Sequence, residues 1–242
     1  VWVGVRTPGT EVPERVDAIL RTVVSRGARL VPPAGDAAAV LGQVHDAGLL
    51  GWLASAADRW AAGGYEQEVG QDRVVPYVFP TAGMLDGVPV REPTATHAAA
   101  GRWCYDTMTL VGPGTWEAAV AAAGVARTAA LLAAGGTPAY GLCRPPGHHA
   151  TRSAHGGSCY LNNAAVAAQT MRDCGLARVA VIDVDAHHGN GTQSLFYDRD
   201  DVFYGSVHVD PGAGWFPHYL GFADETGRGA GTGWNLNVPL PE

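Results

Sequence analysis

Apolar residues recur at helical spacing through much of the first half of the chain. Such residues, three or four positions apart, let one face of a helix be buried. In the longest pattern, Thr115 stands where an N-cap is preferred and Gly135 where helices commonly end. The spacing predicts helices over 13–27, over 36–64 as one or two segments, and over 115–136.

Residues 64–114 keep no sustained period and are rich in Gly, Pro and aromatic residues. Irregular segments of this length in compact domains are usually either functional or disordered. We expect a surface excursion, which could cover an active site.

In the second half, short apolar runs alternate with helical patterns. Runs of Val, Ile and Leu separated by helices are typical of buried parallel strands. Strands are expected over 139–143, 177–185, 201–209 and 234–240, with helices over 160–175 and near 191–197. The chain is therefore predicted to form an α/β fold with a mainly parallel sheet, as one domain over 1–242.

Composition narrows the class of protein. In a chain of 242 residues, 47% hydrophobic content is enough for one large core, and a net charge of −7 argues against nucleic-acid or anionic-membrane partners. The four widely spaced cysteines predict neither a structural zinc cluster nor a disulfide framework. With no signal peptide and no apolar run of membrane-spanning length, we expect a cytoplasmic protein without a membrane partner. The oligomeric state stays open, a homo-oligomer included.

Polar residues of catalytic type follow two of the predicted strands. "VAVIDVDAHHGNGTQ" carries Asp183, Asp185 and His187, and "AYGLCRPPGHHA" ends in His148 and His149. In open α/β sheets ligands bind beyond the carboxyl ends of the strands. Because side chains alternate along a strand, the two aspartates and His187 can point the same way.

This constellation suits a divalent metal such as zinc. Asp185 and His187 supply oxygen and nitrogen ligands, and a catalytic zinc also needs a base for its water. His148 and His149 are the candidates for that base, which leaves Asp183 to orient a histidine. Any one such residue could simply cap a strand end, but two histidine pairs beside an Asp-Val-Asp are hard to explain in that way.

The chain resembles the zinc-dependent histone deacetylases and acetylpolyamine amidohydrolases, which have an arginase-like three-layer fold. The motifs that carry the resemblance are "RPPGHHA", "GGSCYLNNAAVAA", "VAVIDVDAHHGNGTQSLFY" and "DPGAGWFPHYLGFADETGRGAGTGWNLNVPLP". The last is closer to bacterial acetylpolyamine amidohydrolases and class II deacetylases than to class I enzymes.

The resemblance implies a role for each matched residue. Asp185 and His187 would be zinc ligands, with His149 as the better general acid/base of the tandem pair. Asp183 would pair with His148, and Asn190 would contact His149 in place of the aspartate of class I enzymes.

A substrate channel and a second ion are implied in the same way. Gly157 and Phe216 would line the acyl channel, Asp106 would be a rim carboxylate that holds substrate, and Ser158 stands where the channel wall is usually aromatic. A monovalent-cation site, with potassium as the candidate ion, would use the carbonyls of Asp183, Asp185, His187 and Val207 and the hydroxyl of Ser206.

The family's second aspartate ligand and catalytic tyrosine would follow residue 242, so we expect a fold whose C-terminal part is missing and a site with two of three zinc ligands. The parent protein is predicted to remove acetyl or other acyl groups from acetylpolyamines or acetyl-lysine. Two alternatives stay open: an incomplete chain that only binds metal or a partner, and an arginase-type ureohydrolase. The second needs two manganese ions and more carboxylates than "DVDAHHGN" offers.

Overall fold

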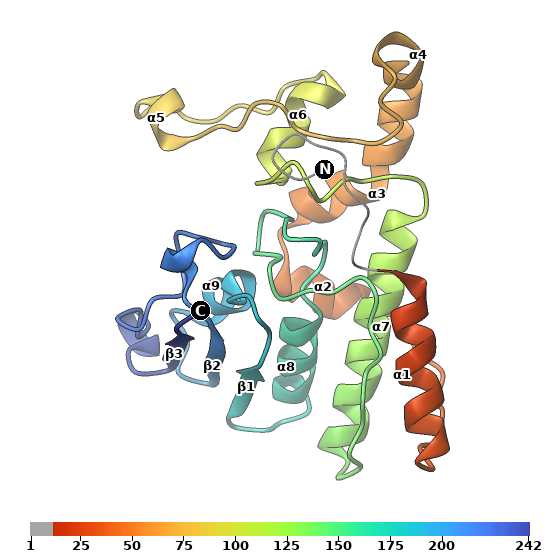
Figure 1. Cartoon of the computed structure of the whole chain (residues 1–242), viewed down its shortest axis with the longest axis vertical. Coiled ribbons are helices and arrows are strands. Elements are labelled where there is room, and N and C mark those ends of the chain that lie inside the picture. The colour runs from red at the N-terminus through yellow and green to blue at the C-terminus, as the bar shows by residue number, and fades with distance from the viewer. Residues whose placement is uncertain (1–11) are drawn as a thin grey trace.

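The computed structural model describes residues 12–242, and its first half is helical (Figure 1). Helix α3 illustrates why these segments form helices. Its apolar residues recur at helical spacing and are all buried: Leu49, Trp52, Leu53, Ala56 and Trp60. They form a core with α2 and the helices that follow. The helices of this half are α1 (Pro13–Ser25), α2 (Ala38–Val44), α3 (Ala47–Ala62), α4 (Tyr65–Val69), α5 (Ala82–Leu85), α6 (Thr96–Trp103) and α7 (Thr115–Ala134).

The segment 64–114 leaves the body as a long excursion, as expected, although it contains three helices where no regular structure was predicted. Figure 1 shows α5 at the far end of this arm, whereas α6 returns to pack on α3. The end of the excursion, residues 104–109, reaches the histidine-bearing loop. Trp103 Nε1 donates to Glu92 Oε1 over 2.9 Å, which holds the irregular segment before α6 to the end of that helix.

Helix α7 differs from the sequence prediction in two respects. Its N-cap is Gly114, and Thr115 is the first helical residue, whose hydroxyl accepts from Gly112 N. Within residues 12–242, α7 is also long and apolar enough to cross a membrane by length and composition, so the expectation of no such run is wrong. Its buried alanines pack against α8 (Asn163–Asp173), as in a core helix of a folded domain.

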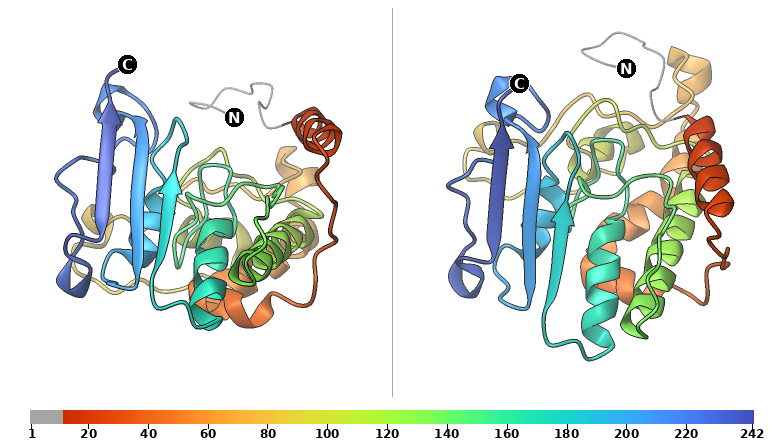
Figure 2. Two further views of the ribbon diagram at one scale, coloured as in Figure 1. Left: turned by 90° about the horizontal axis from the view of Figure 1, so that it is seen from below. Right: turned by 60° about the horizontal axis from the view of Figure 1, so that its bottom comes forward.

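The second half forms a parallel sheet in the order β1 (Val179–Asp183), β2 (Val202–Val209) and β3 (Asn235–Leu240). Helix α9 (Asn190–Phe196) connects β1 to β2, and the short helices η1 (Pro211–Ala213) and η2 (Gly229–Gly231) lie between β2 and β3. Figure 2 shows α8 beside β1, with α7 beyond it. The predicted α/β fold with a parallel sheet is confirmed.

Two layers of the expected three are present within residues 12–242. One face of the sheet is buried, with Tyr204 1% and His208 2% exposed. The opposite face leaves Ile182 64% and Leu236 51% exposed, although parallel sheets are normally covered on both faces.

The strand expected over 139–143 is wrong for the described residues. The segment is irregular, and Cys143 N donates to Gly141 O within the same turn. A strand needs a neighbouring strand for its backbone hydrogen bonds, and the apolar pattern alone could not show that none lies alongside it here.

Candidate active site

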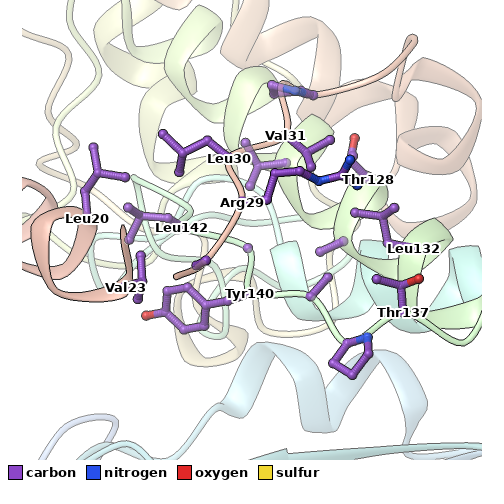
Figure 3. Close-up of a pocket in the computed structure, with 17 residues that line it drawn as sticks. Leu20, Val23, Arg29, Leu30, Val31, Thr128, Leu132, Thr137, Tyr140 and Leu142 are labelled. Atoms are coloured by element: carbon purple, nitrogen blue, oxygen red, sulfur yellow. The ribbon is translucent and has the colours of Figure 1, made fainter. Parts of the chain in front are cut away.

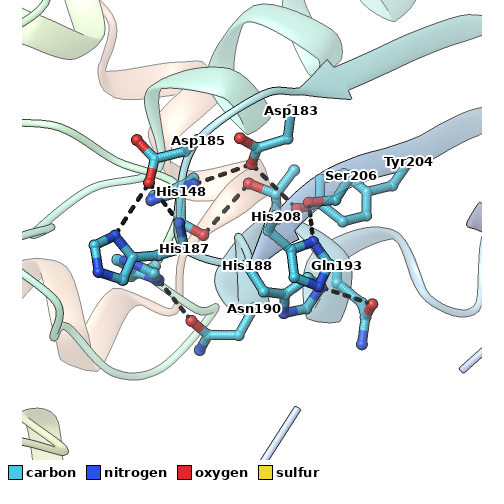
Figure 4. A network of polar contacts seen from close by, with 12 residues as sticks. His148, Asp183, Asp185, His187, His188, Asn190, Gln193, Tyr204, Ser206 and His208 are labelled. Carbon is cyan, nitrogen blue, oxygen red and sulfur yellow. Dashed lines mark hydrogen bonds and ion pairs between the residues drawn. The ribbon is translucent and has the colours of Figure 1, made fainter. Parts of the chain in front are cut away.

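The carboxyl end of β1 presents its polar residues to one edge of the sheet, as the alternation predicted. Asp183 is the last residue of the strand, and Asp185 and His187 follow it in an open turn (Figure 4). Asp185 Oδ1 accepts from His187 N at 2.8 Å and lies 3.2 Å from His187 Nδ1. The hydrogen bonds from His187 hold the pKa of Asp185 below its ordinary range, so it is a carboxylate at neutral pH.

The two histidines of the 144–150 loop lie beside this turn. The rings of His148 and His149 are 4.0 Å apart, and His149 lies 6.1 Å from His187, measured between centroids. The backbone carbonyl of His148 accepts from Thr192 N, which ties the loop to α9. A cavity of about 330 Å³ joins these groups, and it is lined by Arg15, Val16, Ile19, Tyr140, Gly141, Leu142, Cys143, Pro146, His148, His149, Gly157, Asp185 and His187.

His149 is held as a neutral base. Its Nδ1 lies 2.8 Å from Asn190 Oδ1, and because that oxygen can only accept, Nδ1 carries the proton and Nε2 keeps a lone pair. Burial, followed by repulsion from His148, lowers the pKa of His149 to about 3. Phe216 stands perpendicular to the ring at 4.7 Å. The predicted contact with Asn190 is therefore present.

His148 pairs with Asp183 as predicted. His148 Nδ1 lies 3.0 Å from Asp183 Oδ2, which also accepts from the Tyr204 hydroxyl at 3.1 Å. Burial alone would raise the pKa of Asp183, but the hydrogen bonds and charge of His148, aided by Tyr204, lower it. The pair places a negative charge directly behind the histidine tandem.

Asp185 and His187 fit the zinc that the family resemblance implies. Two ligands of a tetrahedral zinc with bonds near 2 Å lie roughly 3.3 Å apart. Asp185 Oδ1 and His187 Nδ1 are 3.2 Å apart and half-exposed to the cavity. Within residues 12–242, no third His, Cys, Asp or Glu joins them as a metal-binding group. The zinc assignment stays a prediction, with two ligands from these residues.

The monovalent-cation site also stays a prediction. The strand register sets Asp183 opposite Ser206, so the proposed carbonyls and hydroxyl start on adjacent strands. The Ser206 hydroxyl already lies 2.8 Å from His208 Nδ1, and Val207 follows with its side chain on the exposed face. The carbonyls of Asp183, Asp185 and His187 belong to the strand end and turn described above.

The residues expected at the acyl channel lie in two groups. Gly157 and Phe216 both contact the His149 ring, consistent with channel walls. Ser158 is exposed, and its backbone adopts φ +63°. It follows Gly157, which lines the cavity, but Ser158 is not itself a lining residue, so its place on the channel wall stays a prediction.

Asp106 is not placed as a rim carboxylate. Its oxygens accept from Met108 N, Thr109 N, the Thr109 hydroxyl and Gly157 N. These four donors occupy the carboxylate, so the expected hold on substrate is corrected to a structural one.

Sequence reasoning missed three aromatic residues of the site. Tyr105 donates to the carbonyl of His149 at 2.8 Å, and Trp215 lies 5.5 Å from the His187 ring. Tyr204, which bonds to Asp183, could have been found, because it alternates along β2 with the inward-facing Ser206. The other two come from loops, whose conformation no periodicity encodes.

A larger cavity, of about 680 Å³, lies between α1, α7 and residues 137–142 (Figure 3). Leu20, Val31 and Leu132 are typical of its apolar lining. It holds no histidine or carboxylate, so the chemistry belongs to the smaller, polar cavity.

Comparison with known proteins agrees with this geometry. The histone deacetylase domain model matches residues 10–242. The chain is 45% identical to acetylpolyamine amidohydrolase of Mycoplana ramosa, over 98% of this chain and 67% of that protein. It is 43% identical to acetylpolyamine amidohydrolase 1 of Pseudomonas aeruginosa, over 96% and 66% of the respective chains.

Comparison with a solved structure supports the same family relationship. The crystal structure of acetylpolyamine aminohydrolase from Burkholderia pseudomallei superposes with a TM-score of 0.87 at 41% identity, covering 98% of this chain and 66% of that one. The chain thus spans about two thirds of the length of these relatives. By the domain match, the identities and the shared fold, this chain belongs to the histone deacetylase family.

Proposed function

We propose that the protein is a zinc-dependent amidohydrolase that removes acetyl or other short acyl groups from amines. Its preferred substrates are acetylpolyamines, ahead of proteins that carry acetyl-lysine. The observation that carries the proposal is a neutral, buried His149 in the same cavity as the Asp185–His187 pair. Two relatives that are more than 40% identical to this chain over the matched residues are named acetylpolyamine amidohydrolases. A net charge of −7 supports a cationic substrate.

The chain's own residues can carry out the two proton transfers that amide hydrolysis requires. Zinc held by Asp185 and His187 would polarise the acyl carbonyl and acidify the attacking water. His149 Nε2 accepts the water's proton as the C–O bond forms. The same nitrogen then delivers that proton to the amine as the C–N bond breaks, which returns His149 to its neutral form.

The neighbours of His149 support this exchange. Asn190 keeps the Nδ1 proton in place, so that only Nε2 takes part. His148 shares its Nδ1 proton with Asp183, whose charge offsets the positive charge that His149 carries between the two steps. Tyr204 holds Asp183 in position.

The arginase-type alternative finds less support in these residues. A second metal would need ligands from the positions after His187. His188 is fully buried with its Nε2 3.0 Å from Gln193 Oε1, and Asn190 is bonded to His149. Neither side chain is available to a second metal in this arrangement.

The test is product release by the zinc-loaded protein. We expect acetate from a monoacetylated diamine, less from an acetyl-lysine peptide, and no urea from arginine. The His149→Ala variant should lose about 10²–10⁴-fold in turnover, the usual contribution of a general acid/base. Zinc binding without acetate from either acylated amine would instead favour a metal-binding module, and urea would favour the ureohydrolase.

A further inference from the structure

Both carboxylate oxygens of Asp106 accept hydrogen bonds from groups of the protein itself. Its Oδ1 accepts from Met108 N and Thr109 N, each at 2.8 Å. Its Oδ2 accepts from Gly157 N at 2.6 Å and from the Thr109 hydroxyl at 3.0 Å. A carboxylate offers about four lone-pair sites, so this one has no acceptor left for a substrate amine. The bond to Gly157 joins two segments 51 residues apart.

Gly157 in turn lies close against the imidazole of His149. A Cβ added at Gly157 would stand 2.4 Å from His149 Cδ2 and 2.6 Å from Cγ, closer than real Cβ atoms come. The residue also has φ +58°, a left-handed conformation that glycine adopts without strain. The Gly157 backbone therefore forms a wall in contact with one side of the ring.

The Thr109 hydroxyl also helps to hold the Gly157–Ser158 turn in place. It donates to Asp106 Oδ2 and accepts from Ser158 N at 2.8 Å. The turn Gly157–Ser158 has two consecutive positive φ values, and a non-glycine residue such as Ser158 needs surrounding contacts to hold it there. We call Asp106 and Thr109, with their bonds to Gly157 and Ser158, the Asp106 brace.

The remaining contacts of His149 do not replace this support. Asn190 fixes the position of Nδ1, Phe216 meets the ring at an interplanar angle of 88°, and the His148 ring lies 4.0 Å away at a tilt of 47°. A hydrogen bond at one nitrogen still allows the ring to tilt about it, and the Gly157 wall limits that tilt. Nε2, which lies opposite the Asn190 bond, depends most on the wall.

We propose that Asp106 is a positioning residue: through the Gly157 amide it holds the His149 ring in the orientation that proton transfer requires. The catalytic consequence rests on the proposed function. A misplacement of about 1 Å in a catalytic group can cost 10²-fold in rate. The effect of losing the brace should therefore appear in kcat.

The central experiment compares Asp106→Asn with matched controls in the zinc-loaded protein. Whichever way the amide turns, one pair of donors loses its acceptor. We expect kcat for an acetylated diamine to fall about 10- to 100-fold, with KM changed less than about threefold. Thr109→Val should show the same pattern in weaker form, and Thr109→Ser, which keeps the hydroxyl, should restore the wild-type rate. Asp36→Asn, which alters a turn carboxylate bonded to Ala38 N, controls for loss of an ordinary surface brace.

A double-mutant cycle separates positioning from general destabilisation. If Asp106 acts through His149, Asp106→Asn should have no further effect on the residual kcat of His149→Ala. An equal loss in both backgrounds would overturn the proposal, as would a rise in KM at unchanged kcat, which would return Asp106 to the substrate rim.

One readout does not depend on activity. Nitrogen-15 spectra of the His149 imidazole should show a single sharp Nε2 signal in the wild type, and a broadened or shifted one in Asp106→Asn. If both the Nε2 signal and kcat are unchanged in Asp106→Asn, the positioning role of Asp106 is refuted, even if the protein is an amidohydrolase. If the wild type releases no acetate, the proposed function fails, whereas the spectra still test the brace.

Discussion

His149 Nδ1 lies 2.8 Å from Asn190 Oδ1 in the buried floor of the cavity. The amide oxygen fixes the tautomer but carries no net charge, so it does little to stabilise an imidazolium ion. Burial and the neighbouring His148 thus keep the pKa of His149 at about 3. The base of this site is neutral throughout the physiological range because burial and the nearby His148 lower its pKa, and the uncharged amide of Asn190 does not offset them.

Asn190→Asp should move the acid limb of the pH profile. A carboxylate bonded to Nδ1 raises the pKa of His149 by roughly 1–3 units, as opposite charges at contact do. Because the base works only when deprotonated, the acid limb of kcat/KM should shift to higher pH. The measurement is kcat/KM against pH for both forms. An unmoved limb would mean that it reports another group.

The loss of zinc affinity on substitution should distinguish the proposed ligand Asp185 from its neighbour Asp183. Asp185→Asn removes a proposed ligand and should weaken zinc binding by more than 100-fold. Asp183→Asn removes a nearby negative charge that is bonded to His148 and not to a proposed ligand, so it should cost roughly tenfold or less. Competition with a chromophoric chelator measures both. Asp86→Asn, at the tip of the α5 arm, is the control and should bind zinc as the wild type does. Equal losses at Asp183 and Asp185 would refute the ligand assignment.

The sequence located this centre because local rules govern it. Alternation along a five-residue strand set Asp183 at the sheet edge, and the open turn after it brought Asp185 and His187 together. The direction of Asp106 could not be read in this way. Its partner Gly157 is 51 residues away, and nothing local to "CYDT" distinguishes a carboxylate facing a backbone amide from one facing substrate.

The strand predicted over 139–143 failed for a similar reason. Its apolar pattern predicts a buried strand, but a strand exists only where a neighbour supplies hydrogen bonds. The α7 boundary also shows the limit of residue preference: Thr115 has a favourable N-cap side chain, yet Gly114 takes that position and Thr115 bonds back to Gly112. Preferences identify the element, and tertiary contacts set its ends.

Two helical glycines should respond oppositely to alanine. At Gly191 in α9 a Cβ would stand 2.3 Å from Ala150 O and 2.5 Å from His149 C, which are backbone atoms that cannot move aside. We expect Gly191→Ala to lower the free energy of unfolding by about 1–3 kcal/mol. Gly51 in α3 has nothing within 4 Å, so Gly51→Ala should raise it by about 0.5–1 kcal/mol. Urea midpoints at constant m measure both, and a stabilising Gly191→Ala would contradict the packing of α9 on the histidine loop.

His45 should make the fold sensitive to acid. The ring is 1% exposed, with Nδ1 2.8 Å from Thr151 O and Nε2 accepting from Asn162 N at 2.9 Å. Burial disfavours the charged ring and lowers the pKa of His45 from 6.5 to about 4. A second ring proton, on Nε2, would also face the Asn162 donor. The unfolded chain therefore binds more protons between these values, and this contribution is complete above pH 6.5 and lost as pH falls towards 4.

The expected loss from His45 between pH 7.5 and pH 5 is about 2 kcal/mol of unfolding free energy. Urea denaturation at the two pH values gives the difference. His45→Gln keeps a polar side chain without a titrating group, so its stability should change less over this range, although it is lower at pH 7.5. An identical pH dependence in the two proteins would assign the acid sensitivity to other groups, such as the buried His155 and His188.

Ser158→Phe should select for small acyl groups. Ser158 is exposed and follows Gly157, which lines the cavity. The family resemblance sets Ser158 at the channel wall, in a position that is usually aromatic. A phenylalanine there narrows the channel, so turnover of butyryl or larger amides should fall about 10- to 100-fold relative to acetyl amides, in line with what misfitted methylene groups cost.

The backbone at this position limits the variant and dictates its control. Ser158 has φ +63°, and a bulky residue in that conformation adds strain of roughly 1–2 kcal/mol, so unfolding must be measured alongside activity. Ser158→Ala keeps a small side chain and the amide bonded to Thr109, and it should leave the acyl ranking unchanged. Ratios of kcat/KM between acyl groups are independent of the amount of folded enzyme. A ranking that is the same in the phenylalanine and alanine variants would therefore rule out Ser158 as the determinant of acyl size.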